Sequence, residues 1–98
     1  MNDLYMEFRN ALYNVQKETG LGAIRLSRLL GVSRDMMKSL LTGRRRPGLR
    51  TIMSVVEGCD AGLRQVPEGP LHHALSKFRD AALRLGDAMA GASNVAGQ

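Results

Sequence analysis

Eight basic residues gather between residues 25 and 50, where they could bind an anion. They are Arg25, Arg28, Arg34, Lys38, Arg44, Arg45, Arg46 and Arg50. Asp35 is the only acidic residue among them, so this basic block carries +7, whereas the rest of the chain has six basic and eight acidic residues and carries −2. A positive block in a mildly negative protein indicates an anionic partner, first nucleic acid and second a membrane surface. A solvated face without a partner is the remaining alternative.

The other chemically active residue types are too few or too poorly spaced to form a catalytic or metal site. Cys59 is the single cysteine, which excludes an internal disulfide and predicts a small buried side chain. His72 and His73 are adjacent, so on a helix they point about 100° apart and make a poor metal pair. Since no paired catalytic carboxylates accompany them, we expect no enzymatic activity, no metal and no cofactor.

Length and composition are those of one small globular domain. The chain has 98 residues, of which 44% are hydrophobic and 23% charged, and its net charge is +5. Aromatic residues make up only 4%, so the core must be aliphatic. Because no stretch is long and apolar enough to cross a membrane, we expect a cytoplasmic protein, associated with the nucleoid if the basic block binds DNA.

Apolar residues recur at helical spacing in five segments, without any alternating strand pattern. The spacing predicts helices over residues 3–18, 23–30, 34–42 and 71–85, and between the last two a helix from Leu49 that Gly58 weakens near its end. Gly20, Gly31 and Gly43 are expected to end the first three helices, and Ser33 to cap the third. Residues 60–70 contain two glycines and two prolines and predict a connector.

Two short helices joined by a glycine turn, after a longer first helix, are the parts of a helix-turn-helix. Gly31 permits the sharp turn, and apolar residues hold the two helices at a fixed angle. The helix after the turn then presents Arg34, Asp35, Lys38 and Ser39 outward. Its N-terminal end can enter a DNA major groove about 12 Å wide, so these four residues are candidates for contacting base edges.

Residues 21–57 resemble the lambda-repressor/Cro-like, or Xre-type, helix-turn-helix family. That family commonly shows a Leu-Gly-Val-Ser turn, a helix, a glycine with basic residues and a proline, and a short Leu-rich helix. Here residues 30–33 are Leu-Gly-Val-Ser, Gly43 precedes Arg44–Arg46 and Pro47, and residues 49–56 form the last segment. The resemblance implies an all-α fold, a four-helix lambda-repressor-like domain to which a C-terminal amphipathic helix is added, and binding to double-stranded DNA.

Three residues depart from the family's pattern. Ala23 stands where the family often has a glutamine that meets the DNA backbone, and Leu41 stands where an acidic residue is common. Met36 lies where a small polar base-contacting residue is frequent, so it either contacts a thymine methyl group or packs. Apolar residues at these positions support an alternative in which the scaffold binds a protein.

The polar residues around the third helix divide into base contacts and phosphate contacts. Arg34 is the best candidate for a base contact, because a guanidinium can bond both O6 and N7 of guanine. Asp35 either accepts from cytosine or caps the helix, where its dipole favours a carboxylate. Phosphate contacts position a protein and carry little sequence information. We assign them to Arg25, Arg28, Ser33, Thr42, Arg44, Arg45 and Arg46.

The C-terminal segment carries an apolar stripe that must be buried somewhere. The stripe consists of Leu71, Leu75, Phe78, Ala82 and Leu85. We expect it to pair with its copy in a homodimer that binds an inverted repeat with half-sites about 34 Å apart. Folding back on its own domain and binding another protein are the alternatives. The chain then divides into a helix-turn-helix domain (1–66), an amphipathic helix (67–86) and a flexible tail (87–98).

Two functions are consistent with these features. The first is a sequence-specific DNA-binding transcriptional regulator, a small dimeric repressor of phage or mobile-element type that occludes a promoter. The second is a protein-interaction module or antitoxin-type autorepressor, which binds a partner protein through the scaffold and the C-terminal helix. The +7 charge of the basic block favours the first.

Overall fold

The computed structural model describes residues 3–96, which form five α-helices. They are α1 (Asp3–Thr19), α2 (Ala23–Leu30), α3 (Arg34–Thr42), α4 (Leu49–Gln65) and α5 (Pro70–Ala96). No strand occurs within these residues, so the prediction of an all-α fold is confirmed. In the same part of the chain, no helix combines the length and the apolar character needed to span a membrane.

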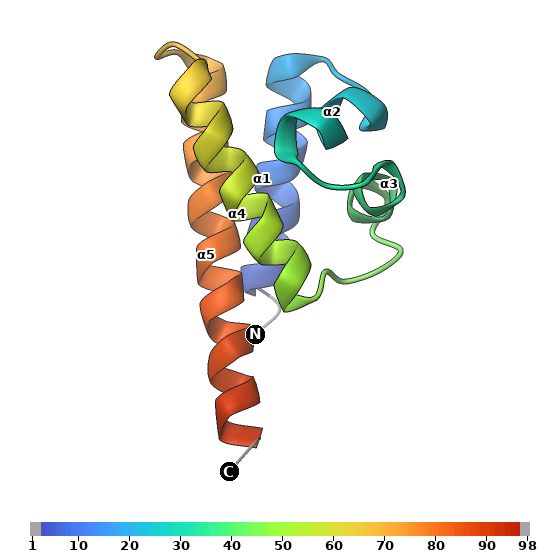
Figure 1. The fold of residues 1–98 in the computed structure, drawn as a ribbon, viewed down its shortest axis with the longest axis vertical. Helices are drawn as coiled ribbons and strands as arrows, with labels where there is room; N and C mark the ends of the chain where they lie inside the picture. The colour runs from blue at the N-terminus through green and yellow to red at the C-terminus, as the bar shows by residue number, and fades with distance from the viewer. Residues whose placement is uncertain (1–2, 97–98) are drawn as a thin grey trace.

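The three long helices α1, α4 and α5 lie side by side, and the short helices α2 and α3 pack on one side of them (Figure 1). α5 contacts both α1 and α4, while α2 contacts α3 and α4, and α3 also touches α1. The molecule measures 43 × 26 × 21 Å. The last turns of α5, drawn in red, reach beyond the ends of α1 and α4 (Figure 1).

One largely aliphatic core joins all five helices. Its fully or almost fully buried side chains include Phe8, Leu12 and Val15 of α1, Leu26 and Leu30 of α2, Met37 and Leu40 of α3, Ile52, Val55 and Cys59 of α4, and Leu75, Phe78 and Ala82 of α5. The rings of Phe8 and Phe78 have centroids 5.1 Å apart and are tilted by 47°, a favourable arrangement for two aromatic rings. α5 therefore belongs to the same core as the four helices before it.

The apolar stripe of α5 is buried within its own chain. Leu75, Phe78 and Ala82 have an exposed fraction of 0%, and Leu71 and Leu85 are half-buried. Of the three fates considered for the stripe, the structure shows the one in which it folds back. In contrast to the prediction, Leu75, Phe78 and Ala82 are then not available as a dimer contact, because they are buried in a core that α5 shares with α1 and α4.

The ends of the first three helices follow the sequence pattern. Gly20, Gly31 and Gly43 have φ angles of 67°, 68° and 73°, in the left-handed region that favours glycine. The Ser33 Oγ atom accepts a hydrogen bond from the backbone N–H of Met36 at 3.1 Å, which confirms the predicted cap of α3.

α4 is longer than the sequence pattern predicts. The pattern weakens at Gly58 and predicts a connector over residues 60–70, but α4 continues to Gln65. A Cβ atom on Gly58 would lie 2.0 Å from the carbonyl oxygen of Leu30, at the C-terminal end of α2. Gly58 therefore permits α2 and α4 to approach closely. Glycine is less favourable than alanine within a helix by about 1 kcal/mol, and the packing of α2 on α4 outweighs this cost.

α5 also continues past its predicted end at Gly86 and runs to Ala96. A Cβ atom on Gly86 would lie 3.1 Å from Cγ2 of Ile52, so this glycine marks close packing against α4 and not a helix end. Residues 87–96 of the predicted tail are helical, and residues 97–98 lie outside the described residues.

Candidate nucleic-acid interface

The turn between α2 and α3 fixes α3 on the core. Leu26 and Leu30 of α2 and Met37 and Leu40 of α3 have exposed fractions of at most 2%. Ser27 is also buried, and its hydroxyl donates a 2.6 Å hydrogen bond to a backbone carbonyl one turn earlier. Because one face of α3 is held by close packing, its opposite face has a fixed direction toward solvent.

Two side chains of α1 hold the C-terminal end of α3. The Tyr13 hydroxyl donates to the carbonyl oxygen of Leu41 at 2.9 Å, and the Arg9 guanidinium donates to that hydroxyl. Arg9 also lies against Gly43, where a Cβ atom would be 2.8 Å from Nη2. A cation is favourable at a helix C-terminus. The sequence did not predict these contacts. Arg9 and Tyr13 lie outside the apolar stripe of α1, and nothing in the neighbouring sequence indicates that they reach α3.

The outward face of α3 presents the residues predicted to contact bases. Arg34, Asp35 and Lys38 are exposed and Ser39 is half-buried. Asp35 lies in the first turn, where the helix dipole stabilises its carboxylate. Met36 is half-buried and packs against the core. Of the two roles considered for Met36, the structure favours packing.

Three of the predicted phosphate contacts, Arg25, Thr42 and Arg44, lie beside this face. Lys38 and Thr42 line a hollow of about 350 Å³ together with Arg44, and Lys38 lines a second one together with Arg25 of α2. The side chains of α2, α3 and the following loop therefore share one surface, with Lys38 at its centre. All seven predicted phosphate contacts are exposed, namely Arg25, Arg28, Ser33, Thr42, Arg44, Arg45 and Arg46. We refer to these seven residues with Arg34, Asp35, Lys38 and Ser39 as the α3 surface.

Arg46 differs from the other arginines of its loop. Its guanidinium lies 4.8 Å from the centroid of the Tyr5 ring on α1, and the next residue, Pro47, is buried. A cation–π contact at an exposed site is worth about 0.5–1 kcal/mol. Arg46 thus has a contact within the chain that competes with its predicted phosphate contact.

The charge of the basic block is not neutralised within the part of the chain whose side chains the structure describes. There the ion pairs join Arg79 to Asp60 and to Asp80, and Arg84 to Glu7. None of them involves a basic residue of the block. Its positive charge therefore remains available to an anionic partner.

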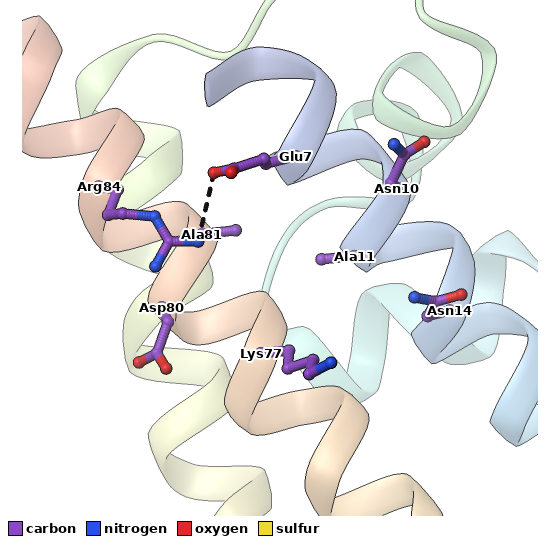
Figure 2. A pocket seen from close by; sticks show the side chains of 8 residues that line it. All are labelled: Glu7, Asn10, Ala11, Asn14, Lys77, Asp80, Ala81 and Arg84. Carbon is purple, nitrogen blue, oxygen red and sulfur yellow. Dashed lines mark hydrogen bonds and ion pairs between the residues drawn. The ribbon is translucent and has the colours of Figure 1, made fainter. Parts of the chain in front are cut away.

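A separate polar hollow, of about 460 Å³, lies between α1 and α5, away from the α3 surface. Figure 2 shows the residues that line it, Glu7, Asn10, Ala11 and Asn14 of α1 and Lys77, Asp80, Ala81 and Arg84 of α5. The guanidinium of Arg84 donates to the Glu7 carboxylate at 3.3 Å. Because two acidic and two basic side chains balance each other here, this hollow has no preference for an anion.

Cys59 is fully buried, as predicted. Burial, with a smaller contribution from the Asp60 carboxylate, raises the pKa of its thiol to about 12. A thiol that stays protonated at neutral pH is a poor nucleophile. Among the described residues, His, Cys, Asp and Glu side chains form no group that could hold a metal ion.

Raising the pH is expected to destabilise the fold through Cys59. The thiol has an ordinary pKa of 9.0 and a folded pKa of about 12, so the folded state retains its proton between these values. The stability from Cys59 is complete below the lower pKa and falls by up to about 1.4 kcal/mol per pH unit above it. Urea unfolding measures the free energy of unfolding of wild type and of Cys59→Ala. The difference between the two should decrease from about pH 8 to about pH 11. A constant difference between the two would contradict this.

Comparisons of the chain with protein-family models, with curated proteins and with solved structures gave no match. The basis for assigning a function is therefore the α3 surface, with its exposed cations and its fixed position on the core.

Proposed function

We propose that this chain is a sequence-specific transcriptional regulator that binds double-stranded DNA. The observation that carries the proposal is the α3 surface, since a short helix offers an exposed basic face while its other face is buried in the core. The major groove of B-DNA admits one α-helix. In this proposal α2, the turn and α3 act as a helix-turn-helix with α3 in the groove, as the resemblance to the lambda-repressor/Cro-like family implies.

The two kinds of contact have different consequences in this proposal. Arg34 and Lys38 contact base edges and select the sequence. Ser39, which lies one turn after Asp35, faces the same groove. Arg44 and Arg45 contact phosphates at one end of α3, and the arginines of α2 contact the backbone beside it. A protein bound in this way over a promoter would regulate by occluding it.

Selection of bound sequences from a random duplex pool tests the proposal. At about 150 mM salt, purely electrostatic binding is suppressed, so the expected result is an enriched motif. An inverted repeat would indicate two copies on the DNA, joined through a surface other than the buried stripe of α5. No enrichment, together with binding that disappears as salt rises, would refute sequence-specific binding.

Two substitutions on the α3 surface are expected to have different effects. Arg34→Ala should relax the preference at one base position by about 1–3 kcal/mol, because a bidentate contact to guanine is lost. Arg45→Ala should weaken binding to all duplexes alike and reduce the slope of log affinity against log salt by about 1. Fluorescence anisotropy with matched and mismatched duplexes measures both effects, with Lys77→Ala on α5 as control. Identical behaviour of the two arginine variants would argue against the assigned roles.

The competing proposal, a protein-interaction module or antitoxin, has less support. The three apolar departures that suggested it, Ala23, Met36 and Leu41, pack against the core of their own chain. The stripe of α5 is buried there as well. Much of the apolar surface that would have attracted a partner protein is therefore covered within the chain.

A further inference from the structure

A hollow of about 220 Å³ beside the start of α3 combines one arginine with three hydroxyl groups. The turn residues 31–33 and Met36 line one side, and Arg50, Thr51 and Ser54 of α4 line the other. None of the described residues that line it is acidic. Arg50 belongs to the basic block and is exposed, whereas Thr51 and Ser54 are half-buried.

The side chains of this hollow suit an oxyanion. The Ser33 Oγ atom accepts a hydrogen bond from the backbone N–H of Met36, so its own proton remains free for another acceptor. A guanidinium presents several N–H donors in a plane and matches phosphate geometry. One guanidinium and the hydroxyls of Ser33, Thr51 and Ser54 can therefore surround a single phosphate group.

We propose that this hollow binds one phosphate of the DNA backbone, held by the Arg50 guanidinium with the hydroxyls of Ser33 and Ser54. The inference rests on the proposed function. The sequence placed Arg50 in the basic block but assigned it no contact, so the inference adds α4 to the DNA contacts of α2, α3 and the loop after α3.

The position of the hollow supports a backbone contact. α3 has nine residues and is therefore about 14 Å long. The hollow lies at its N-terminal end, and Arg44 follows its C-terminal end. The major groove is about 12 Å wide, so a helix in the groove with a cation at each end can contact the phosphates on both sides. Arg50 then fixes how deeply and at which angle α3 enters the groove.

The test compares Arg50→Ala with Arg64→Ala on the duplex enriched in the selection. Arg64 is a matched control, since it is also exposed on α4 but lies in the last turn. Arg50→Ala is expected to reduce the slope of log affinity against log salt by about 1, while the base preference stays unchanged. Arg64→Ala is expected to leave both unchanged. Thermal unfolding of each variant checks that the fold is retained.

Single methylphosphonate substitutions in the same duplex locate the phosphate. Each one replaces a charged phosphate with a neutral group. At one position the substitution is expected to weaken wild-type binding and to have no effect on Arg50→Ala, because the variant has already lost that contact.

Three results would overturn the inference. Equal slopes for Arg50→Ala and Arg64→Ala would remove Arg50 from the interface and leave the proposed function intact. Failure of the wild-type protein to bind any duplex would overturn both. Saturable binding of inorganic phosphate that moves the amide resonances of Ser33 and Ser54 and is lost in Arg50→Ala, without a change in the DNA slope, would assign the hollow to free phosphate.

Discussion

Gly58→Ala is expected to destabilise the protein by at least about 3 kcal/mol, a large part of the roughly 5–15 kcal/mol that stabilises a typical domain. The added Cβ atom would lie 2.0 Å from the carbonyl oxygen of Leu30, 2.4 Å from its carbonyl carbon and 2.9 Å from its Cα. These are backbone atoms, so no side-chain rotation relieves the overlap. α2 would have to move away from α4, which opens the core around Leu30.

Gly91→Ala is the matched control for this change. Gly91 lies in α5, and a Cβ atom there would have no atom within 4 Å. The same substitution should therefore stabilise the protein slightly, by up to about 1 kcal/mol, through helix propensity alone. Urea unfolding of both variants measures the two effects, which are expected to have opposite signs. A Gly58→Ala protein as stable as wild type would show that α2 and α4 are not in close contact.

Phe78→Ala is expected to cost about 3–5 kcal/mol, because it removes a fully buried ring and leaves a cavity beside Phe8. The loss tests whether α5 completes the core of its own chain. His73→Ala, an exposed position on the same helix, should change stability by no more than about 0.5 kcal/mol. Thermal and urea unfolding of the two variants give the comparison.

The same experiment separates folding back from pairing of two copies. If α5 closes its own core, the melting temperature of the wild-type protein does not depend on protein concentration. If the stripe instead joined two copies, the melting temperature would rise with concentration and Phe78→Ala would convert a dimer to a monomer. Light scattering after gel filtration distinguishes these results.

The predictions that succeeded rest on signals contained within a few residues. Gly31 and Gly43 have positive φ angles because a helix that ends there needs a left-handed residue, and few other residues tolerate that conformation. Ser33 caps α3 because its hydroxyl reaches an N–H three positions later. The exposure of Arg34 and Lys38 follows from the helical period, since the apolar residues of α3 occupy the other face.

The predictions that failed needed knowledge of a distant neighbour. A glycine within a helical pattern indicates either a helix end or a close contact, and only the position of Leu30 explains Gly58. An amphipathic stripe shows that a helix face is buried but not what covers it. The stripe of α5 could therefore be predicted, and its burial on α1 and α4 could not.

The candidate site shows the same division. Residue types and spacing predicted its exposed cations. The support from Arg9 and Tyr13 and the approach of Arg50 to the start of α3 depend on how α1 and α4 pack, which the local sequence does not specify.

The contact between Phe8 and Phe78 also determines when the core of the protein can close during synthesis. The two rings come from α1 and from α5, the last described helix to leave the ribosome. Translation adds about 5–20 residues per second, so the apolar face of α1 waits roughly 3–12 seconds for Phe78, and that of α4 roughly 1–3 seconds. In that interval the chain already has its basic residues, but α1 and α4, which support α3 and α2, lack their covering helix. In the proposed function, a nascent chain would then attract nucleic acid through charge alone, and selective binding would begin only when α5 docks.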